Sequence, residues 1–242
     1  IWKFIFLLWR IHLSMKKIFL SFSFLLFYML VYCQKPENIN ITLEIVFNND
    51  NIVLDDPVYQ TDNGTSIKFE TLKFYISQIQ LLKNDKVVFA EQNSYHLIDI
   101  FDPASLNILL TPQQNINFNK IKFSLGVDSV TNVSGAMGGD LDPTKGMYWT
   151  WQSGYINFKM EGRWANKHNL KNEFEFHLGG YQYPYNPVQT VELTTTDNNW
   201  NIVLDLGQFF NAVNLDRQKS IMSPCADAVL LSRQVAKCFR IR

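Results

Sequence analysis

The stretch SIKFETLKFYISQIQLLKNDKVVFA (Ser66 to Ala90) decides the fold class of this chain. β-branched and aromatic residues fill its first part, Ser66 to Leu82, and predict two strand-like pieces. Asn84-Asp85 is a turn signal, and the apolar run from Lys86 to Ala90 behind it predicts a further strand. Strands this close together, joined by a tight turn, indicate β-structure.

Short strands of the same kind, separated by polar turns, run outward from this stretch in both directions. In ITLEIVF (Ile41 to Phe47) every second residue is apolar, which indicates a strand with one buried face. Strands at this spacing, with almost no helices between them, predict an all-β fold, an antiparallel β-sandwich or open barrel. The other predicted strands are Tyr95–Ile100, Lys120–Val127, Ser153–Gly162, Asn172–Gly180, Val188–Thr194 and Asn201–Leu206.

Two stretches interrupt the strand pattern. Val130 to Trp149 is a long loop rich in Gly, Asp and Pro, and loops of that length inside compact domains are disproportionately functional. Near the C-terminus, apolar residues at helical spacing follow the start signal Ser223-Pro224 and predict one amphipathic helix over residues 224–239. We expect this helix to pack on the sandwich or to cover its open end.

The N-terminal residues predict export. Met15-Lys16-Lys17 precedes an apolar run that ends at Tyr32, so residues 15–33 are predicted to be a signal peptide with cleavage before Gln34. The alternative is an N-terminal membrane anchor, but the run is shorter than the ~20 residues of a comfortable membrane span. We therefore expect a periplasmic or extracellular protein with no transmembrane segment after cleavage.

A lipoprotein anchored through Cys33 is a further alternative, although the bulky Tyr32 before that cysteine argues against it. Residues 1–14 contain no initiator methionine and are interpreted as upstream sequence that is not native to the protein. The mature chain is then predicted to be a single domain, residues 34–242.

Charge and motifs exclude several function classes. The chain carries 22 basic and 22 acidic residues, and four of the basic ones precede Gln34, which leaves 18 basic and 22 acidic residues after them. A mildly acidic chain is not expected to bind nucleic acid. The sequence has no GxSxG, HExxH or P-loop motif and no recognisable pair of catalytic carboxylates, so we expect no enzyme activity.

Two cysteines remain after the predicted signal peptide, Cys225 and Cys238. An even pair in an oxidising compartment predicts a disulfide that closes a short loop. The alternative is two unpaired thiols on the C-terminal helix. Their spacing fits neither a CxxC redox pair nor a zinc knuckle.

Several motifs together resemble the MbnP family, a group of methanobactin-associated proteins. The most specific is DLDPTKGMYWTWQSGYI (Asp140 to Ile156), followed by KMEG (Lys159 to Gly162) and FHLGG (Phe176 to Gly180). Three further stretches also match the family pattern: LGVDSVTN (Leu125 to Asn132), FYISQIQL (Phe74 to Leu81) and YHLIDI (Tyr95 to Ile100). The resemblance extends from about Ile39 to Asp205.

The resemblance implies a secreted or periplasmic β-sandwich that binds copper, as Cu⁺ or Cu²⁺. In better-known family members, two histidine imidazoles and a tryptophan oxidised to kynurenine hold the metal. The resemblance also implies a partner, a di-haem peroxidase-like enzyme that carries out this oxidation. The expected function is copper scavenging or transport.

His177 is the first candidate ligand, because it lies in the family's FHLGG motif and imidazole is a good ligand for copper. If Phe174 and Phe176 point one way along the strand, His177 points the other way. The alternative is a hydrogen-bonded core histidine. His96 is predicted to be mainly structural, on the strand face opposite Asp99, and His168 is predicted to lie in an exposed loop.

Trp149 and Trp151 are the candidates for oxidation to kynurenine. In an extended backbone they share one face, which also fits an ordinary buried aromatic pair.

Asp140 and Asp142 form a possible secondary site for a hard cation, although two carboxylates before Pro143 are more often turn formers.

The sequence departs from the family in the second histidine. Family members place it near the end of the first strand, where this chain has IVFNND (Ile45 to Asp50). Either His96 substitutes for it, or the copper site is weaker, or copper binding is lost.

A rival hypothesis is a sandwich that binds carbohydrate or peptide through exposed aromatic residues such as Tyr181, Tyr183 and Tyr185.

Overall fold

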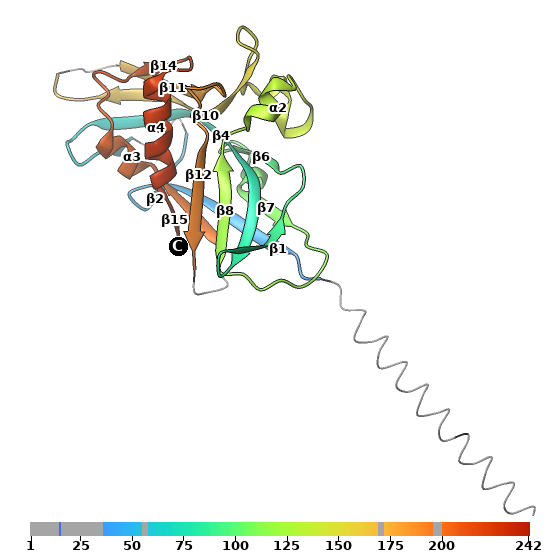
Figure 1. Cartoon of the computed structure of the whole chain (residues 1–242). Coiled ribbons are helices and arrows are strands. Elements are labelled where there is room, and N and C mark those ends of the chain that lie inside the picture. The colour runs from blue at the N-terminus through green and yellow to red at the C-terminus, as the bar shows by residue number, and fades with distance from the viewer. Residues whose placement is uncertain (1–14, 16–35, 55–57, 169–171, 196–199) are drawn as a thin grey trace, which may run out of the picture. The chain divides into compact units, whose positions relative to one another are not determined.

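The computed structural model describes residues 15, 36–54, 58–168, 172–195 and 200–242 (Figure 1). Residues 1–14 and nearly all of the predicted signal peptide, with Cys33, lie outside the described residues, so the export signal and the lipid anchor stay predictions. By its contacts the chain divides into two units, residues 1–37 with 111–115 and residues 38–110 with 116–242. The strands and helices described below belong to the second unit.

The organising element is strand β4 (Ser66–Lys83), which is 18 residues long. The sequence predicts two pieces here, but the strand is continuous. Gln78 adopts a left-handed φ of 54°, and the pairing with β8 shifts register between Ser77 and Gln80. Such a bulge absorbs the extra residues and bends the strand without ending it.

Strand β4 lies inside a ten-stranded sheet. The path through the sheet is β12 (Gln189–Thr194), β8 (Lys120–Leu125), β4, β10 (Gly154–Ala165), β11 (Asn172–Gly179) and β14 (Ser220–Ile221). Attached beside this path are β3 (Tyr59–Gln60), β5 (Lys86–Ala90), β6 (Tyr95–Asp99) and β9 (Tyr148–Trp149). The pairings are antiparallel except for β11 with β14.

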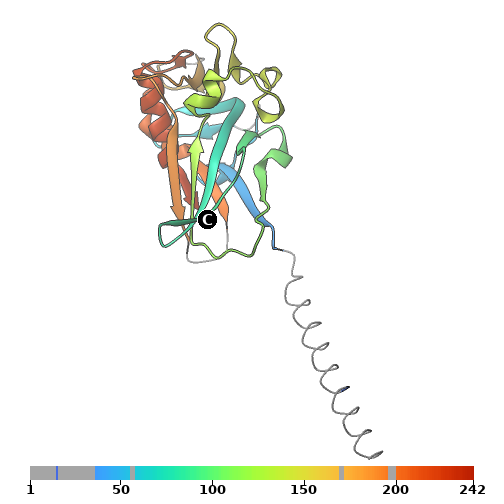
Figure 2. The same cartoon turned by 45° about the vertical axis from the view of Figure 1, so that its right-hand side comes forward.

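A second, five-stranded sheet packs against the first. It contains β15 (Phe239–Ile241), β13 (Asn201–Asp205), β1 (Ile39–Phe47) and β2 (Asp50–Asn51), and β7 (Asn107–Leu110) pairs with β1. Strands β1 and β13 run parallel, with Thr42 opposite Asn201. The sheets curl into a half-barrel (Figure 2), which confirms the predicted all-β class, although the sheets are not purely antiparallel.

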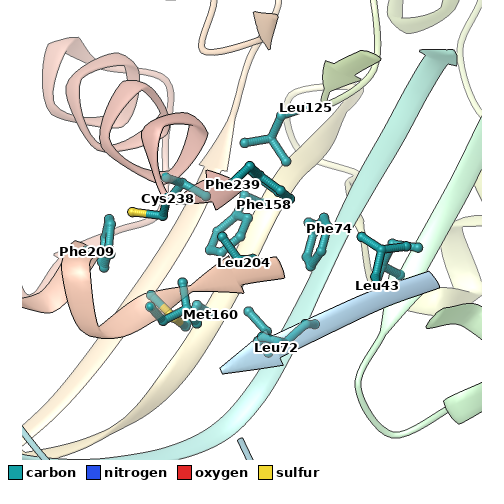
Figure 3. Close-up of a cluster of buried hydrophobic side chains, with 14 of the residues drawn as sticks. Leu43, Leu72, Phe74, Leu125, Phe158, Met160, Leu204, Phe209, Cys238 and Phe239 are labelled. Atoms are coloured by element: carbon teal, nitrogen blue, oxygen red, sulfur yellow. The ribbon is translucent and has the colours of Figure 1, made fainter. Parts of the chain in front are cut away.

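The main core lies between the two sheets (Figure 3). The alternate residues of β1 are buried in it as predicted, since Ile41, Leu43, Ile45 and Phe47 are at most 5% exposed. Phe74 of β4 stacks on Phe158 of β10 with ring centroids 5.6 Å apart, and Phe239 meets Phe74 edge-on at 6.1 Å. Each such buried side chain contributes about 1.5–3 kcal/mol to the stability of the fold.

Helices are few. Two short ones are α2 (Ser129–Val133) and α3 (Leu206–Ala212), and three 3-10 turns span Pro103–Leu106, Gly139–Leu141 and Pro143–Lys145. The predicted C-terminal helix forms as α4 (Ala226–Lys237) and buries Ala228, Leu231 and Val235 against β11 and β12. No helix in the described parts of the chain is long and apolar enough to cross a membrane.

The predicted disulfide between Cys225 and Cys238 is wrong, because both thiols are free. Cys225 is the N-cap of α4 and Cys238 is its C-cap. At a rise of 1.5 Å per residue the two Cα atoms are roughly 20 Å apart, whereas a disulfide needs them within about 7 Å. The helix that the sequence predicted is therefore what separates the two cysteines.

Candidate functional site

The long loop, Val130 to Trp149, folds over the face of the ten-stranded sheet that points away from the main core. There it forms a second apolar cluster, which we call the outer cluster: Tyr75, Leu97, Val127, Leu141, Met147, Trp149, Tyr155 and Ile156. The hydroxyl of Tyr75 donates to the Asp140 carbonyl at 3.0 Å, and the hydroxyl of Tyr155 donates to the Leu141 carbonyl at 3.0 Å. The long loop is thus a folded layer that is fixed to the sheet.

Asn132 is the polar centre of this layer and is 1% exposed. Its Nδ2 donates to the carbonyls of Val127 and Asp128 at 2.9 and 3.0 Å, and its Oδ1 accepts from the Tyr155 backbone amide at 2.8 Å. One buried amide side chain therefore joins the start of the loop to the strand that follows it. A buried polar group with several partners fixes the local structure.

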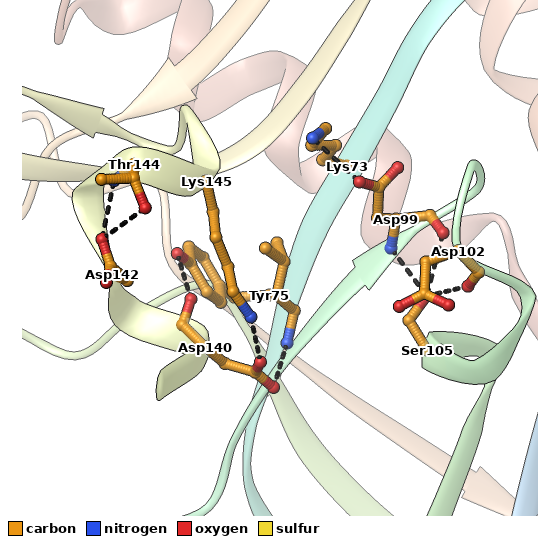
Figure 4. Close-up of polar contacts among 10 residues, drawn as sticks. Lys73, Tyr75, Asp99, Asp102, Ser105, Asp140, Asp142, Thr144 and Lys145 are labelled. Carbon is orange, nitrogen blue, oxygen red and sulfur yellow. Dashed lines mark hydrogen bonds and ion pairs between the residues drawn. The ribbon is translucent and has the colours of Figure 1, made fainter. Parts of the chain in front are cut away.

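The two acidic candidates hold the loop in place (Figure 4). Asp140 accepts from the Lys145 ammonium group at 2.7 Å and from the Leu97 backbone amide at 3.1 Å. Asp142 caps the following 3-10 turn, accepting from the backbone amide and hydroxyl of Thr144 at 2.8 and 2.7 Å. Both carboxylates therefore anchor the loop, as expected of turn-forming residues, and the secondary cation site stays a prediction.

Trp149 and Trp151 differ more than the sequence predicted. Strand β9 contains only Tyr148 and Trp149, and a turn begins at Thr150, so the two tryptophans do not share an extended strand. Trp149 is 6% exposed and belongs to the outer cluster, whereas Trp151 is 65% exposed. Their rings still touch, with centroids 5.5 Å apart.

Gly179 determines where the Trp149 ring lies. A Cβ atom added to Gly179 would be 2.7 Å from Cζ3 of Trp149 and 2.8 Å from the Tyr155 carbonyl oxygen. The indole therefore occupies the space that a side chain at position 179 would fill. His177 is two residues earlier on the same strand and points to the same face, about 7 Å along it.

His177 is buried at 6% exposure and points away from the main core, as predicted, while Phe174 and Phe176 point into it. Its Nε2 lies 2.6 Å from Oε1 of Glu161 on the neighbouring strand β10. The hydrogen bond from His177 lowers the pKa of Glu161 to about 2, against the opposing effect of burial and with help from Thr71 and Lys159. The pair is therefore an imidazole held by a carboxylate.

Glu161 is the residue that the sequence reasoning missed. It lies in the KMEG motif, but no role was assigned to it. The feature that could have identified Glu161 is its position diagonal to His177. Across β10 and β11, Lys159 pairs with His177 and Glu161 pairs with Glu175. Diagonal neighbours on one face are within reach of long side chains, but recognising them requires the register.

His96 does not join this site. It lies in register with Ile76, whose side chain is in the main core, and its Nε2 contacts Glu91 at 2.8 Å. His177 alternates with the core residues Phe176 and Leu178 and so points to the opposite face. The hypothesis that His96 supplies the missing second imidazole is therefore wrong. His168 is exposed, as predicted.

These positions define what the site offers to a metal. It contains one imidazole, one carboxylate bonded to it and one buried indole. Within the described residues there is no group of three or more His, Cys, Asp or Glu side chains that could hold a metal ion. The donor set fits a site with a single imidazole and does not fit one with two.

Comparisons with known proteins agree with this architecture. A family model described as MbnP matches residues 36–223. Among solved structures, MbnP from Methylosinus trichosporium is similar, with a TM-score of 0.54 and 14% sequence identity over 81% of this chain and 88% of that chain. At that identity the likeness concerns the fold. No curated protein matches the chain.

Proposed function

The chain belongs to the MbnP family, and we propose that it is an exported copper-binding protein that acts as a scavenger or carrier and not as an enzyme. The observation that carries this proposal is the His177–Glu161 pair, 2.6 Å apart and on the same sheet face as Trp149. It is a buried imidazole with a fixed orientation, inside the part of the chain that matches the family.

His177 would be the principal copper ligand. Imidazole suits copper, and metal-bound histidines commonly bond their other ring nitrogen to a carboxylate. Because Nε2 is engaged by Glu161, Nδ1 is the ring nitrogen left for a metal. Glu161 would orient the ring, and the low pKa of this carboxylate keeps it charged at neutral pH.

Trp149 is the residue that we propose for oxidation to kynurenine. Its benzo ring packs on Gly179, two residues from His177, whereas Trp151 is mostly exposed. A kynurenine at position 149 would offer an aniline nitrogen and a carbonyl oxygen to the metal. The proposed oxidant is a partner enzyme of the di-haem peroxidase type, and Trp151 would be the aromatic contact between Trp149 and the surface.

The missing second histidine sets the expected strength of the site. With His96 on the other face of the sheet, two explanations from the sequence remain, a weaker site or a lost one. We propose the weaker site, because this chain has the buried pair of His177 and Glu161. The affinity for copper should then be lower than that of a site with two imidazoles.

The test is copper titration of the protein against two single variants. We expect His177→Ala to weaken binding at least about tenfold, which corresponds to ~1.4 kcal/mol. The matched control His168→Ala removes an exposed imidazole and should leave the affinity unchanged. Equal affinity for the wild type and His177→Ala would refute the proposal. The intact mass of the natively produced protein would show separately whether a tryptophan is converted to kynurenine, and peptide mapping would show whether it is Trp149.

A further inference from the structure

The segment after β11 forms a small pocket that the proposed copper site does not use. The pocket encloses about 400 Å³, within the ~300–1,000 Å³ of small-molecule sites. None of its lining residues is charged. They are Gln152, Tyr181, Gln182, Tyr183, Tyr185 and Pro224.

The backbone of this segment is fixed by the rest of the fold. The Ser129 hydroxyl donates to the Tyr181 carbonyl at 2.9 Å, and the Tyr185 amide donates to the Gln182 carbonyl at 2.8 Å. The ring of Tyr181 packs against Gly154, where an added Cβ would be 3.2 Å from its Cε1 atom. A ligand would therefore meet a wall that is already formed, which lowers the entropy cost of binding.

The side chains of the pocket keep their hydrogen-bonding capacity. Among the described residues, the amides of Gln152 and Gln182 and the three tyrosine hydroxyls have no hydrogen-bond partner. Tyr183 is 96% exposed and Tyr185 is 44% exposed, so both side chains are accessible to solvent. Each primary amide offers two donors and one acceptor, and each phenol offers a donor and an acceptor.

This combination selects the chemistry of the ligand. A lining without charge gives no attraction to phosphates, carboxylates or cations. Aromatic faces match the C–H faces of a sugar ring, and amides match hydroxyl groups, which both donate and accept hydrogen bonds. A proline-rich peptide would instead need an extended groove lined by aromatic rings, whereas this pocket encloses about 400 Å³ and is lined by six residues.

We propose that this pocket binds a neutral saccharide, with the Tyr185 ring as the stacking platform and Gln182 as the main hydrogen-bonding group. The pocket lies directly after Gly179 and Gly180, at the end of the strand that carries His177. The protein would then hold a sugar-containing surface or polymer beside its proposed copper site.

The experiment is calorimetric titration of the full chain, free of copper, with four probes: cellohexaose, maltohexaose, mannohexaose and chitohexaose. We expect at least one to bind with a Kd of about 1 mM or tighter. Tyr185→Ala should weaken that binding at least about tenfold, and Tyr185→Phe, which keeps the ring, less than about threefold. Gln182→Ala should weaken it as well. Phe101→Ala is the control, because Phe101 is an exposed aromatic residue outside the pocket.

Three results would overturn the saccharide proposal. They are no binding of any probe at millimolar concentration, equal binding by the wild type and Tyr185→Ala, and binding of decaproline that Tyr185→Ala abolishes. Copper titration of Tyr185→Ala should match the wild type, since this substitution leaves the His177–Glu161 pair intact. The saccharide proposal and the copper proposal can therefore fail independently.

Discussion

The Nε2 atom of His177 lies 2.6 Å from Oε1 of Glu161, diagonally across strands β10 and β11. This contact joins the two family motifs that contain these residues, FHLGG and KMEG. It fixes the orientation of the His177 imidazole, which neither motif specifies alone. The contact also makes the stability of the protein depend on pH.

Glu161→Gln should remove part of that pH dependence. The folded-state pKa of Glu161 is lowered from 4.5 to about 2, so the carboxylate stabilises the fold above about pH 4.5 and loses this effect as the pH falls toward 2. The contribution at neutral pH is on the order of 1–3 kcal/mol. Denaturant unfolding at pH 6 and pH 3 should show a smaller difference in the free energy of unfolding for Glu161→Gln than for the wild type.

Glu192→Gln is the control for that measurement. Glu192 contacts Lys120 at 2.6 Å on the surface, and its side chain is 45% exposed. Exposed ion pairs contribute only ~0–1 kcal/mol, so this variant should follow the wild-type pH profile. An unchanged profile in Glu161→Gln would contradict the role given to the buried pair.

Gly179→Ala should displace Trp149. The added Cβ would be 2.7 Å from the indole and 2.8 Å from a backbone oxygen, and the latter cannot move without shifting β10. We expect a loss of about 1–3 kcal/mol in the free energy of unfolding and a change in tryptophan fluorescence. Gly138→Ala is the matched control, because its Cβ would meet nothing within 4 Å. Equal stability of the two variants would argue against the close packing at Gly179.

The two tryptophans should respond differently to truncation. Trp149→Ala removes a buried ring of the outer cluster and should cost about 3–5 kcal/mol. Trp151→Ala removes a ring that is 65% exposed and should cost less than about 1 kcal/mol. Thermal or denaturant unfolding of both variants gives the comparison. A larger cost for Trp151→Ala would mean that the burial of the pair is reversed.

The two cysteines should be free and unequally reactive. Burial raises the pKa of the Cys238 thiol to about 12, and thiols react as thiolates, so Cys238 should resist alkylation in the native protein. Cys225 is partly exposed at the N-terminus of α4 and should be labelled first. Peptide mapping after brief native alkylation checks this order, and recovery of a Cys225–Cys238 disulfide peptide would contradict the structure.

Much of the fold could be predicted from local patterns. The alternation in Ile41–Phe47 gave the buried face of β1, and the spacing of Ala228, Leu231 and Val235 gave α4. The parallel pairing of β1 with β13 could not be predicted, since it joins residues at opposite ends of the domain. Hydrophobic alternation indicates which face is buried but not which strand lies alongside.

The site was less predictable than the fold. The motif identified His177, but its partner Glu161 and its separation from His96 depend on the register of strands β4, β6, β10 and β11. The pairing of Cys225 with Cys238 failed because counting cysteines ignores the rigid length of the helix between them. Each of these points depends on long-range geometry, which spacing along the chain does not specify.

The parallel pairing of β1 with β13 also determines the order of events during folding. Strand β1 lies between β13 and β7, so the five-stranded sheet cannot close until Asn201–Asp205 has been synthesised. Contacts between residues so distant in sequence slow folding and keep the nascent chain open. The first strand of this chain therefore finds its parallel partner only late in synthesis, and the chain stays unfolded for longer. An unfolded chain is what passage through a translocation channel requires.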